Sequence, residues 1–509
     1  MPLQTNQQTY VGFMEKLVRL YRNPLRNKIL ESYSSISYRV TSYLAGMEGI
    51  LFHRTRRKIH ADQARRYLLI LAGDHRLPGE QIREFGLYAA ARAYACIVDS
   101  GCLNNTDRKK IENQLIYSGL KARESRLPIP NPPIPRVNNH CTFAMAGCEM
   151  IGHLFPDREE TIRLRLFAEE IWNDWWAIRE TPEVASHYEP FTQTSLFHIA
   201  DLRGWTDIFF SDSIIKASFE RNLQHLSPMG VLTTYGDGTW ATSWGWWIAV
   251  FERAAVYYRD GRYKWAAKRI LDYAYKQEFW KNANNSLKRS KLPLSTKHLL
   301  DADVLIASYG LALAADWEDN SLPEEVPKVL SGTTYRYLFS SGPPFKKGKR
   351  FQEKLILRAG WKKDDLYIAI SLLKRAWHDQ YDAGAILFLV CKGAMLLHET
   401  GVEWKTPIFH NVLLIRPEEE NFLDPQVSAS ENSFASTEFL SEQSRTCFSK
   451  INSPMHQGYP IDHTRSIVMG KQNPIIGIWD TATVKNDPYY TRETHETIWG
   501  NKPDFAKSL

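Results

Sequence analysis

Residues 321–350 read SLPEEVPKVLSGTTYRYLFSSGPPFKKGKR, and the character of the chain changes across this stretch. It is rich in Pro, Gly and Ser, which favour turns and loops over long helices. Before it the apolar residues recur with helical spacing, and after it they tend to alternate as in strands. We therefore predict a linker with a first edge strand at 321–350, between one domain at 1–320 and another at 351–509.

The first domain is predicted to be all-α. Apolar residues recur at i, i+3, i+4 and i+7 in a long series of segments, such as REFGLYAAARAYACIVD (83–99) and TIRLRLFAEEIWNDWWAI (161–178). The connectors between these segments are short and carry Pro, Gly, Asn and Asp. Because such a series can close into inner and outer rings of helices, we expect an α/α toroid.

The second domain is predicted to be an antiparallel β-sandwich. Runs such as DLYIAISLL (365–373) and AILFLVCKG (385–393) have the length and composition of strands. Residues 418–462 are polar and poorly periodic, which indicates a long loop, and the end of the chain lacks a clear core pattern. An incomplete sandwich is therefore one interpretation. The predicted fold class is α+β and multidomain, with the toroid first and the sandwich second.

Composition and charge limit the partners. The net charge is +7 and the pI is about 8.9, which suits an anionic partner. Short basic clusters at 54–58 and 346–350 come without a nucleic-acid-binding motif, so we interpret them as solvated surface. No apolar run reaches the roughly 18 residues of a membrane span. We expect neither a nucleic acid nor a membrane as partner, and the oligomeric state is not indicated.

The N-terminal residues MPLQTNQQTY are polar and hold no apolar core of an export signal. The sequence thus favours the cytoplasm, or the periplasm or the exterior if a signal was removed. The six cysteines form no CxxC pair and are too few for a disulfide scaffold in a chain of 509 residues.

Asn138, Asn139 and His140 lie directly before an apolar helical segment. Asparagine is well suited to cap a helix N-terminus, which explains one of the two amides. Capping does not explain the whole Asn-Asn-His cluster, so a functional interpretation stands beside the structural one.

Two further polar clusters precede later helices. One consists of Glu183, His187, Tyr188 and Glu189, and it is either a capped helix start or part of a site. The other is a Gly-Asp-Gly turn at Asp237 with aromatic residues around it. Tyr235 begins this turn, and the tryptophans that follow it either stack on sugar rings or fill the core; they are Trp240, Trp244, Trp246 and Trp247.

A fourth cluster lies in the β half. His378, Gln380 and Tyr381 come just before the apolar run at 385–393, and Glu399 and His410 follow in neighbouring runs. A surface turn is the simple interpretation. Two histidines beside acids at strand ends could also form a metal site or a hydrogen-bonded cluster.

Taken together, these segments resemble the heparinase II/III-like polysaccharide lyases, a group that includes exo-acting alginate lyases. The similarity is greatest over 357–415, which contains Arg-Ala-Gly-Trp at 358–361, His-x-x-x-Asp-Ala-Gly at 378–384 and Thr-Pro-Ile-Phe-His-Asn at 406–411. In the helical half, Asn139-His140, Glu183 with Tyr188, and the turn at Asp237 occur in the family's order. The resemblance covers roughly 130–480.

The resemblance implies a substrate cleft between toroid and sandwich, and β-elimination at a uronic acid that leaves a 4,5-unsaturated uronate. Asn139 and His140 would neutralise the uronate carboxylate. Tyr188 would protonate the leaving O4, and Tyr188 itself, His140 or His378 would remove the C5 proton. The expected partner is an anionic uronic-acid polysaccharide or oligosaccharide. The remaining expected substrate-binding residues are Asn138, Glu183, His187, Tyr235, Asp237, Trp240, Trp244 and Tyr381.

The family's zinc ligands fall at positions that here read Gln380, Glu399 and His410. Glutamate and histidine can ligate zinc, whereas a glutamine amide is a poor ligand. No cofactor is required, and the sequence leaves a structural zinc open.

Two other functions stay open. A glycoside hydrolase on a helical toroid would need two carboxylates that flank one bond, for which Glu183 and Asp237 are the candidates. A carbohydrate-binding protein without catalytic activity would need neither.

Overall fold

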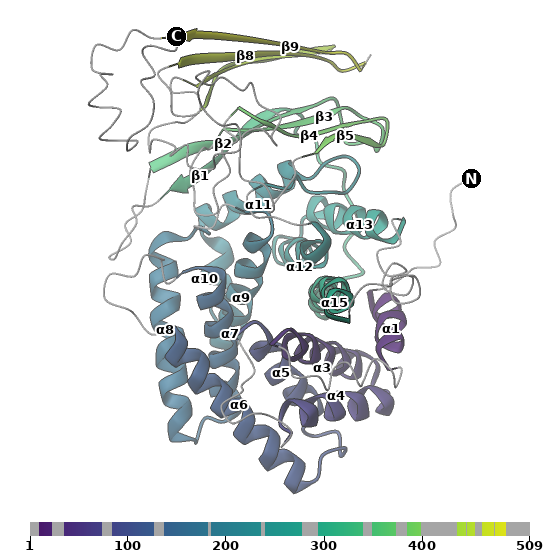
Figure 1. The fold of residues 1–509 in the computed structure, drawn as a ribbon, viewed down its shortest axis with the longest axis vertical. Helices are drawn as coiled ribbons and strands as arrows, with labels where there is room; N and C mark the ends of the chain where they lie inside the picture. The colour runs from purple at the N-terminus through teal and green to yellow at the C-terminus, as the bar shows by residue number, and fades with distance from the viewer. Residues whose placement is uncertain are drawn as a thin grey trace.

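The computed structural model describes residues 10–22, 35–73, 84–126, 137–181, 185–235, 240–276, 294–338, 349–372, 384–398, 435–443, 445–453, 461–472 and 474–484. Helices occupy the N-terminal part of these residues, and strands occupy the C-terminal part (Figure 1). The helices are α1 (Tyr10–Tyr21), α3 (Ser35–Thr55), α4 (Lys58–Leu71), α5 (Glu84–Ile97), α6 (Asn105–Ser125), α7 (Asn139–Leu154), α8 (Glu159–Ile178), α9 (Tyr188–Arg203), α10 (Thr206–Ser211), α11 (Ser213–His225), α12 (Trp240–Tyr258), α13 (Gly261–Lys276) and α15 (Leu294–Trp317).

Six of these helices form a closed ring. Helix α3 contacts α5, α5 contacts α7, α7 contacts α9, α9 contacts α12, α12 contacts α15, and α15 returns to α3. Helices α4, α6, α8 and α13 pack against members of this ring. Since inner and outer helices alternate along the chain, the predicted α/α toroid is confirmed.

Glycine lets α12 and α15 approach closely. A Cβ on Gly245 would lie 1.8 Å from the carbonyl oxygen of Ala307, and one on Gly310 would lie 2.3 Å from the backbone nitrogen of Trp246. Both contacts are with backbone, which cannot turn aside as a side chain can. The two helices therefore pack with backbone against backbone where the ring closes.

The strands form two antiparallel sheets. One has the order β1 (Gly332–Leu338), β2 (Lys349–Arg358), β3 (Tyr367–Ser371), β4 (Ile386–Cys391) and β5 (Ala394–His398). The other has the order β6 (Ser436–Glu442), β7 (Thr446–Ser453), β8 (Ile461–Gly470) and β9 (Ile476–Val484). The fold is thus α+β, and the predicted sandwich is confirmed. The loop predicted over 418–462 is wrong in part, because β6 and β7 lie within it.

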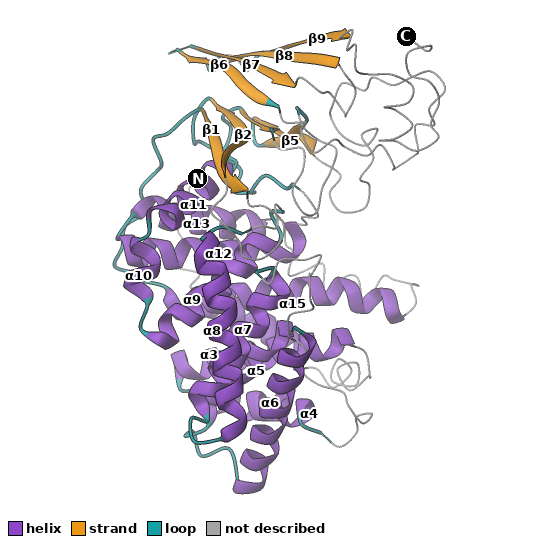
Figure 2. Ribbon diagram, turned by 90° about the vertical axis from the view of Figure 1, so that its left-hand side faces the viewer, coloured by secondary structure: helices purple, strands orange, loops and turns teal. Residues whose placement is uncertain are grey.

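The first sheet lies between the helices and the second sheet (Figures 1 and 2), and its strands β3 and β4 are buried on both faces. Ile368 and Ile370 share a core with Ile467 of the second sheet. Tyr367 and Phe388 point the other way and share a core with the segment after α11. Burial on both faces explains why β3 and β4 read as continuous apolar runs.

The helical and sheet regions meet close to the stretch that first marked the change. Helix α15 ends at Trp317 and strand β1 begins at Gly332. The division into domains at 1–320, 321–350 and 351–509 stays a prediction. No helix in the described ranges is both long and apolar enough to cross a membrane.

Candidate active site

The Asn-Asn-His cluster forms the start of α7. Asn138 is the N-cap, and its side chain accepts a hydrogen bond from the backbone N–H of Cys141 at 2.9 Å. This is the capping role that the sequence offered as the simple interpretation. Asn139 follows as the first helical residue, and its side chain is buried. His140 comes next, with 41 % of its side chain exposed.

His140 is held by a buried carboxylate at the start of α5. Its Nδ1 lies 2.8 Å from Glu84 Oε1, and Arg126 Nη2 donates to the same oxygen at 2.6 Å. Arg126 Nη2 also lies 3.0 Å from His140 Nδ1. With Nδ1 protonated and donating to Glu84, the lone pair of the neutral ring lies on Nε2. The three residues come from three different helix ends.

The electrostatics favour an ionised Glu84. Burial by itself would raise the pKa of this carboxyl group, but the hydrogen bond from His140 and the charge of Arg126 outweigh it and lower the pKa to about 2. Glu84 is therefore a carboxylate at neutral pH, as an acceptor that fixes the His140 ring must be.

A chain of ring contacts links His140 to Tyr188. The His140 ring meets Phe85 edge-on with centroids 4.6 Å apart, and Phe85 meets Phe143 at 5.0 Å. These contacts continue across α7 and α9 to the second predicted cluster. The continuing pairs are Phe143–Phe191 at 5.7 Å, Phe191–His187 at 4.7 Å and His187–Tyr188 at 5.0 Å.

Positive charge gathers at the same helix ends. The first turns of α5, α7 and α9 are linked by the contacts above, and each helix N-terminus carries a partial positive charge. The Arg39 guanidinium lies 4.3 Å above the Phe85 ring, and Arg126 is partly exposed. Glu84 offsets one of these charges. The arrangement suits an anionic ligand.

Hydrogen bonds from two other segments hold the turn before Tyr188 in place. The backbone N–H of Ser186 donates to the carbonyl of Tyr235 at 3.1 Å, and the indole N–H of Trp247 donates to the Ser186 carbonyl at 3.1 Å. Tyr188 then begins α9 and is partly buried against the toroid core. These contacts set the position of Tyr188 from α12 and from the segment after α11.

Glu189, the next residue, anchors α9 to the first sheet. Its carboxylate accepts from Arg221 of α11 at 2.5 Å and from Arg336 of β1 at 2.6 Å. Arg336 also donates to Glu353 of β2 at 3.1 Å. These residues belong to a buried cluster with equal numbers of acids and cations, which we call the interface cluster. Its members are Glu180, Glu189, Glu353, Arg221, Arg336 and Lys354.

The interface cluster keeps its charges because they are paired. Burial would raise the pKa of Glu189, but Arg221 and Arg336 outweigh it and lower the pKa to about 2. Arg336 and Lys354 likewise hold the pKa of Glu353 well below its usual range against the effect of burial. Burial lowers the pKa of Lys354 to about 8, against the opposing pull of Glu353. A charge left alone here would be strongly unfavourable.

Several predicted binding residues lie in the interior. Tyr235 is 4 % exposed and donates from its hydroxyl to Glu189 at 3.1 Å. Trp244 is 2 % exposed and meets Phe13 edge-on at 6.2 Å. For both residues the structure shows packing contacts, which is the core interpretation. Trp240 begins α12.

Other predicted residues fall outside the described ranges, so their roles stay predictions. They are Glu183, Asp237, His378, Gln380, Tyr381, Glu399 and His410. Within the described ranges, no group of three or more His, Cys, Asp and Glu residues could hold a metal ion.

The sequence did not identify the charged residues that hold His140 and Glu189 in place. Glu84 and Arg126 lie 56 and 14 residues from His140. Arg336 lies 147 residues from Glu189. No local pattern distinguishes these charges from solvated ones. An acid at the start of an apolar helix and a cation in an alternating strand were the only signals.

The ring of helices with two packed antiparallel sheets defines the class: a helical toroid joined to a β-sandwich. A solved structure of heparinase III has this fold, with a TM-score of 0.51 and 10% identity over 86% of this chain and 63% of that one. The predicted resemblance is thus confirmed at the level of the fold.

Two other solved structures are similar at lower scores. Another heparinase III has a TM-score of 0.49 and 12% identity, over 93% of this chain and 70% of that one. Heparan sulfate lyase HepC from Pedobacter heparinus has a TM-score of 0.46 and 13% identity, over 86% of this chain and 60% of that one. This chain therefore spans about 60% of the length of HepC. No family model and no curated protein matches the sequence.

Proposed function

We propose that the protein is a polysaccharide lyase that cleaves a uronic-acid-containing glycan by β-elimination. One observation carries the proposal: His140 is partly exposed, bound through Nδ1 to the buried Glu84, and linked by ring contacts to His187 and Tyr188. The heparinase III fold supports it. No described residue selects one uronan over another.

The reaction begins with recognition of a carboxylate. The C5 proton of a uronate is weakly acidic, and its removal places negative charge on the carboxyl group. Donors and positive charge aimed at that group favour the enolate-like state. Arg126 and the positive end of α7 can supply both, and Asn139 is proposed to add an amide donor. His140 adds a further donor only where another group is the base and Nε2 carries a proton.

Proton transfer follows. A base takes the C5 proton, the C5–H electrons form the C4–C5 double bond, and the C4–O4 bond breaks. Tyr188 is proposed to give its phenolic proton to O4. His140 Nε2 can act as the base in the tautomer that Glu84 favours, and Tyr188 or His378 is the other candidate.

An assay of the unsaturated product tests this proposal. The full chain is incubated with a panel of uronic-acid polymers and short oligosaccharides, and the ultraviolet absorbance of the 4,5-unsaturated uronate is followed. His140→Ala should abolish the signal. The matched control is His53→Ala, which changes an exposed histidine near the end of α3 and should leave the signal unchanged.

The assay also separates the other functions. New reducing ends without ultraviolet absorbance would indicate a hydrolase. Binding of the glycans without cleavage, unaffected by His140→Ala, would indicate a binding protein.

A further inference from the structure

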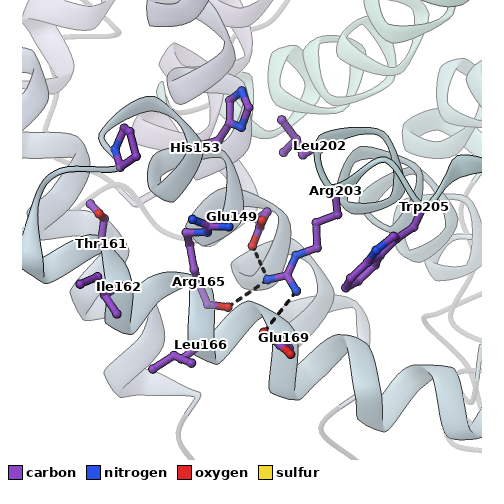
Figure 3. Close-up of a pocket in the computed structure, with 11 residues that line it drawn as sticks. Glu149, His153, Thr161, Ile162, Arg165, Leu166, Glu169, Leu202, Arg203 and Trp205 are labelled. Carbon is purple, nitrogen blue, oxygen red and sulfur yellow. Dashed lines mark hydrogen bonds and ion pairs between the residues drawn. The ribbon is translucent and has the colours of Figure 1, made fainter.

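A second pocket lies at the far end of α7 from His140. The end of α7, the first turns of α8 and the end of α9 enclose it, and its volume is about 470 Å³ (Figure 3). That volume lies within the usual range of about 300–1,000 Å³ for small-molecule sites. His153 at this pocket follows His140 by 13 residues, or about 20 Å along a helix. The pocket is therefore separate from the candidate active site.

Arg203 forms a fixed floor of this pocket. Its Nη2 lies 2.7 Å from Glu149 Oε2 and donates to the Arg165 carbonyl at 3.1 Å, while Nη1 lies 3.5 Å from Glu169 (Figure 3). The guanidinium also lies 4.9 Å above the Trp205 ring. Side chains of Arg203 and Glu149 are 9% and 3% exposed, so both are ordered before a ligand arrives. The Nε of Arg203 is buried and finds no hydrogen-bond partner in the described part of the chain.

Arg165 provides a second cation. The absence of a Cβ on Gly152 leaves room for it, since an added Cβ would lie 2.3 Å from Arg165 Cγ. The side chain thus rests against α7 and is exposed at the pocket. Among the described residues, no carboxylate forms an ion pair with Arg165. Its guanidinium is available to a ligand oxygen.

An apolar wall faces these charges. Ile162 and Leu166 are one turn apart on α8, so they lie on the same side of the helix. Their exposed fractions are 55% and 57%, which is high for large aliphatic residues. The pocket thus combines planar donors and acceptors with an aliphatic surface.

We propose that this pocket binds one uncharged sugar unit of a glycan. Neighbouring sugar hydroxyls each donate and accept, so they can bridge the carboxylate of Glu169 and the guanidinium groups of Arg165 and Arg203. The C–H face of the ring then covers Ile162 and Leu166.

The balanced charge of the pocket favours an uncharged sugar unit over a uronate. Arg165 and Arg203 are balanced by Glu149 and Glu169, so the four groups sum to zero. An added carboxylate would meet Glu169 as well as Arg165. The pocket therefore differs in preference from the positive helix ends near His140, and the inference does not rest on the lyase proposal.

Saturation-transfer NMR on the full chain tests the inference. The probes are methyl glucoside, methyl galactoside and methyl glucuronide. At least one neutral glycoside should bind and the glucuronide more weakly. Arg165→Ala and Glu169→Gln should each weaken neutral-glycoside binding about tenfold, as expected for loss of a hydrogen bond to a charged group. Leu166→Trp should narrow the pocket and also weaken binding.

The matched control is Arg163→Ala, which removes an exposed arginine of α8 that does not line the pocket and should leave binding unchanged. Three results would overturn the inference: no transfer to either neutral glycoside, equal binding by the wild type and the pocket variants, or tighter binding of the glucuronide. Activity on uronans is measured separately, so failure of this inference and failure of the lyase proposal are distinguishable.

Discussion

His140 shows how a single side chain gains a chemical role from a distant partner. Its Nδ1 is 2.8 Å from Glu84, which is 56 residues earlier in the chain. A histidine at the start of an apolar helix has no defined tautomer by itself. The buried carboxylate sets the ring orientation and leaves Nε2 for a ligand.

Tyr188 is the residue on which the proposed proton transfer depends most. Tyr188→Phe should lower the rate of elimination by about 10²- to 10⁴-fold, the usual contribution of a general acid or base. The melting temperature should stay unchanged, because the ring still packs against the toroid core. The readout is release of unsaturated product.

Tyr257→Phe is the matched control, since this tyrosine lies near the end of α12 with its hydroxyl 3.5 Å from the Asp207 carbonyl. It should retain full activity. Wild-type turnover by Tyr188→Phe would remove Tyr188 from the mechanism.

Glu84 should make stability depend on pH. Its pKa is lowered from 4.5 to about 2 in the folded protein. A lowered carboxyl pKa contributes stability that is fully present above about pH 4.5 and is lost as the pH falls towards about 2. Glu84→Gln should therefore lower the melting temperature at pH 7, and the difference from wild type should shrink at pH 3.

Thermal unfolding at both pH values measures this effect. Glu124→Gln is the control, because Glu124 is exposed and its pair with Lys121 is worth little. An equal loss at pH 7 and pH 3 for Glu84→Gln would show that the effect is steric and not electrostatic.

Among the elements, outer helices such as α4 and α8 bury one face and show the helical period clearly, whereas the ring helices α7 and α9 are buried on nearly all sides. The sequence pattern did not show which residues make the contacts between helices. Gly245 and Gly310 let α12 and α15 meet through backbone. These two glycines are 65 positions apart, and no local sequence pattern marks them as a contact between helices.

Gly245→Ala should destabilise the toroid. The added methyl group would meet the Ala307 carbonyl, so α12 and α15 must separate, at a cost of about 1–3 kcal/mol or more. Chemical denaturation followed by tryptophan fluorescence measures the loss. The control is Gly332→Ala, where the nearest atom to the new Cβ is 4.0 Å away, and its unfolding midpoint should move little.

At the scale of the whole molecule, the interface cluster joins the helical region to the first sheet. It links α9 and α11 to β1 and β2 directly behind Tyr188. The position of the sheet and the position of the candidate site are thus set by the same charges. The described cluster is balanced, which makes each member costly to remove.

Arg336→Met should cost about 3–5 kcal/mol of unfolding free energy, because Glu189 and Glu353 lose a shared partner while buried. Urea denaturation measures this value. Arg158→Met is the control, since its pair with Glu160 is exposed and worth at most about 1 kcal/mol. A loss as small as that of the control would show that the interface cluster does not hold the two regions together.

The order of the two regions follows from the sequence alone. Helical spacing before 320 and strand-like runs after it predicted a toroid followed by a sandwich, because hydrophobic period follows the local geometry of the backbone. The sequence also indicated that one asparagine of the Asn-Asn-His cluster caps a helix, and it marked His140 as a candidate for function. Strands β6 and β7 were not predicted, because their residues are largely polar.

Which charges pair with each other became visible in the folded protein. Glu84 with His140, and Arg336 with Glu189, are pairs between elements far apart in the chain. The tertiary structure also shows Tyr235 and Trp244 buried in packing contacts, and it brings the end of α7, the first turns of α8 and the end of α9 together around a second pocket. Such contacts depend on how helices and sheets pack in three dimensions, and local sequence patterns carry no record of that packing.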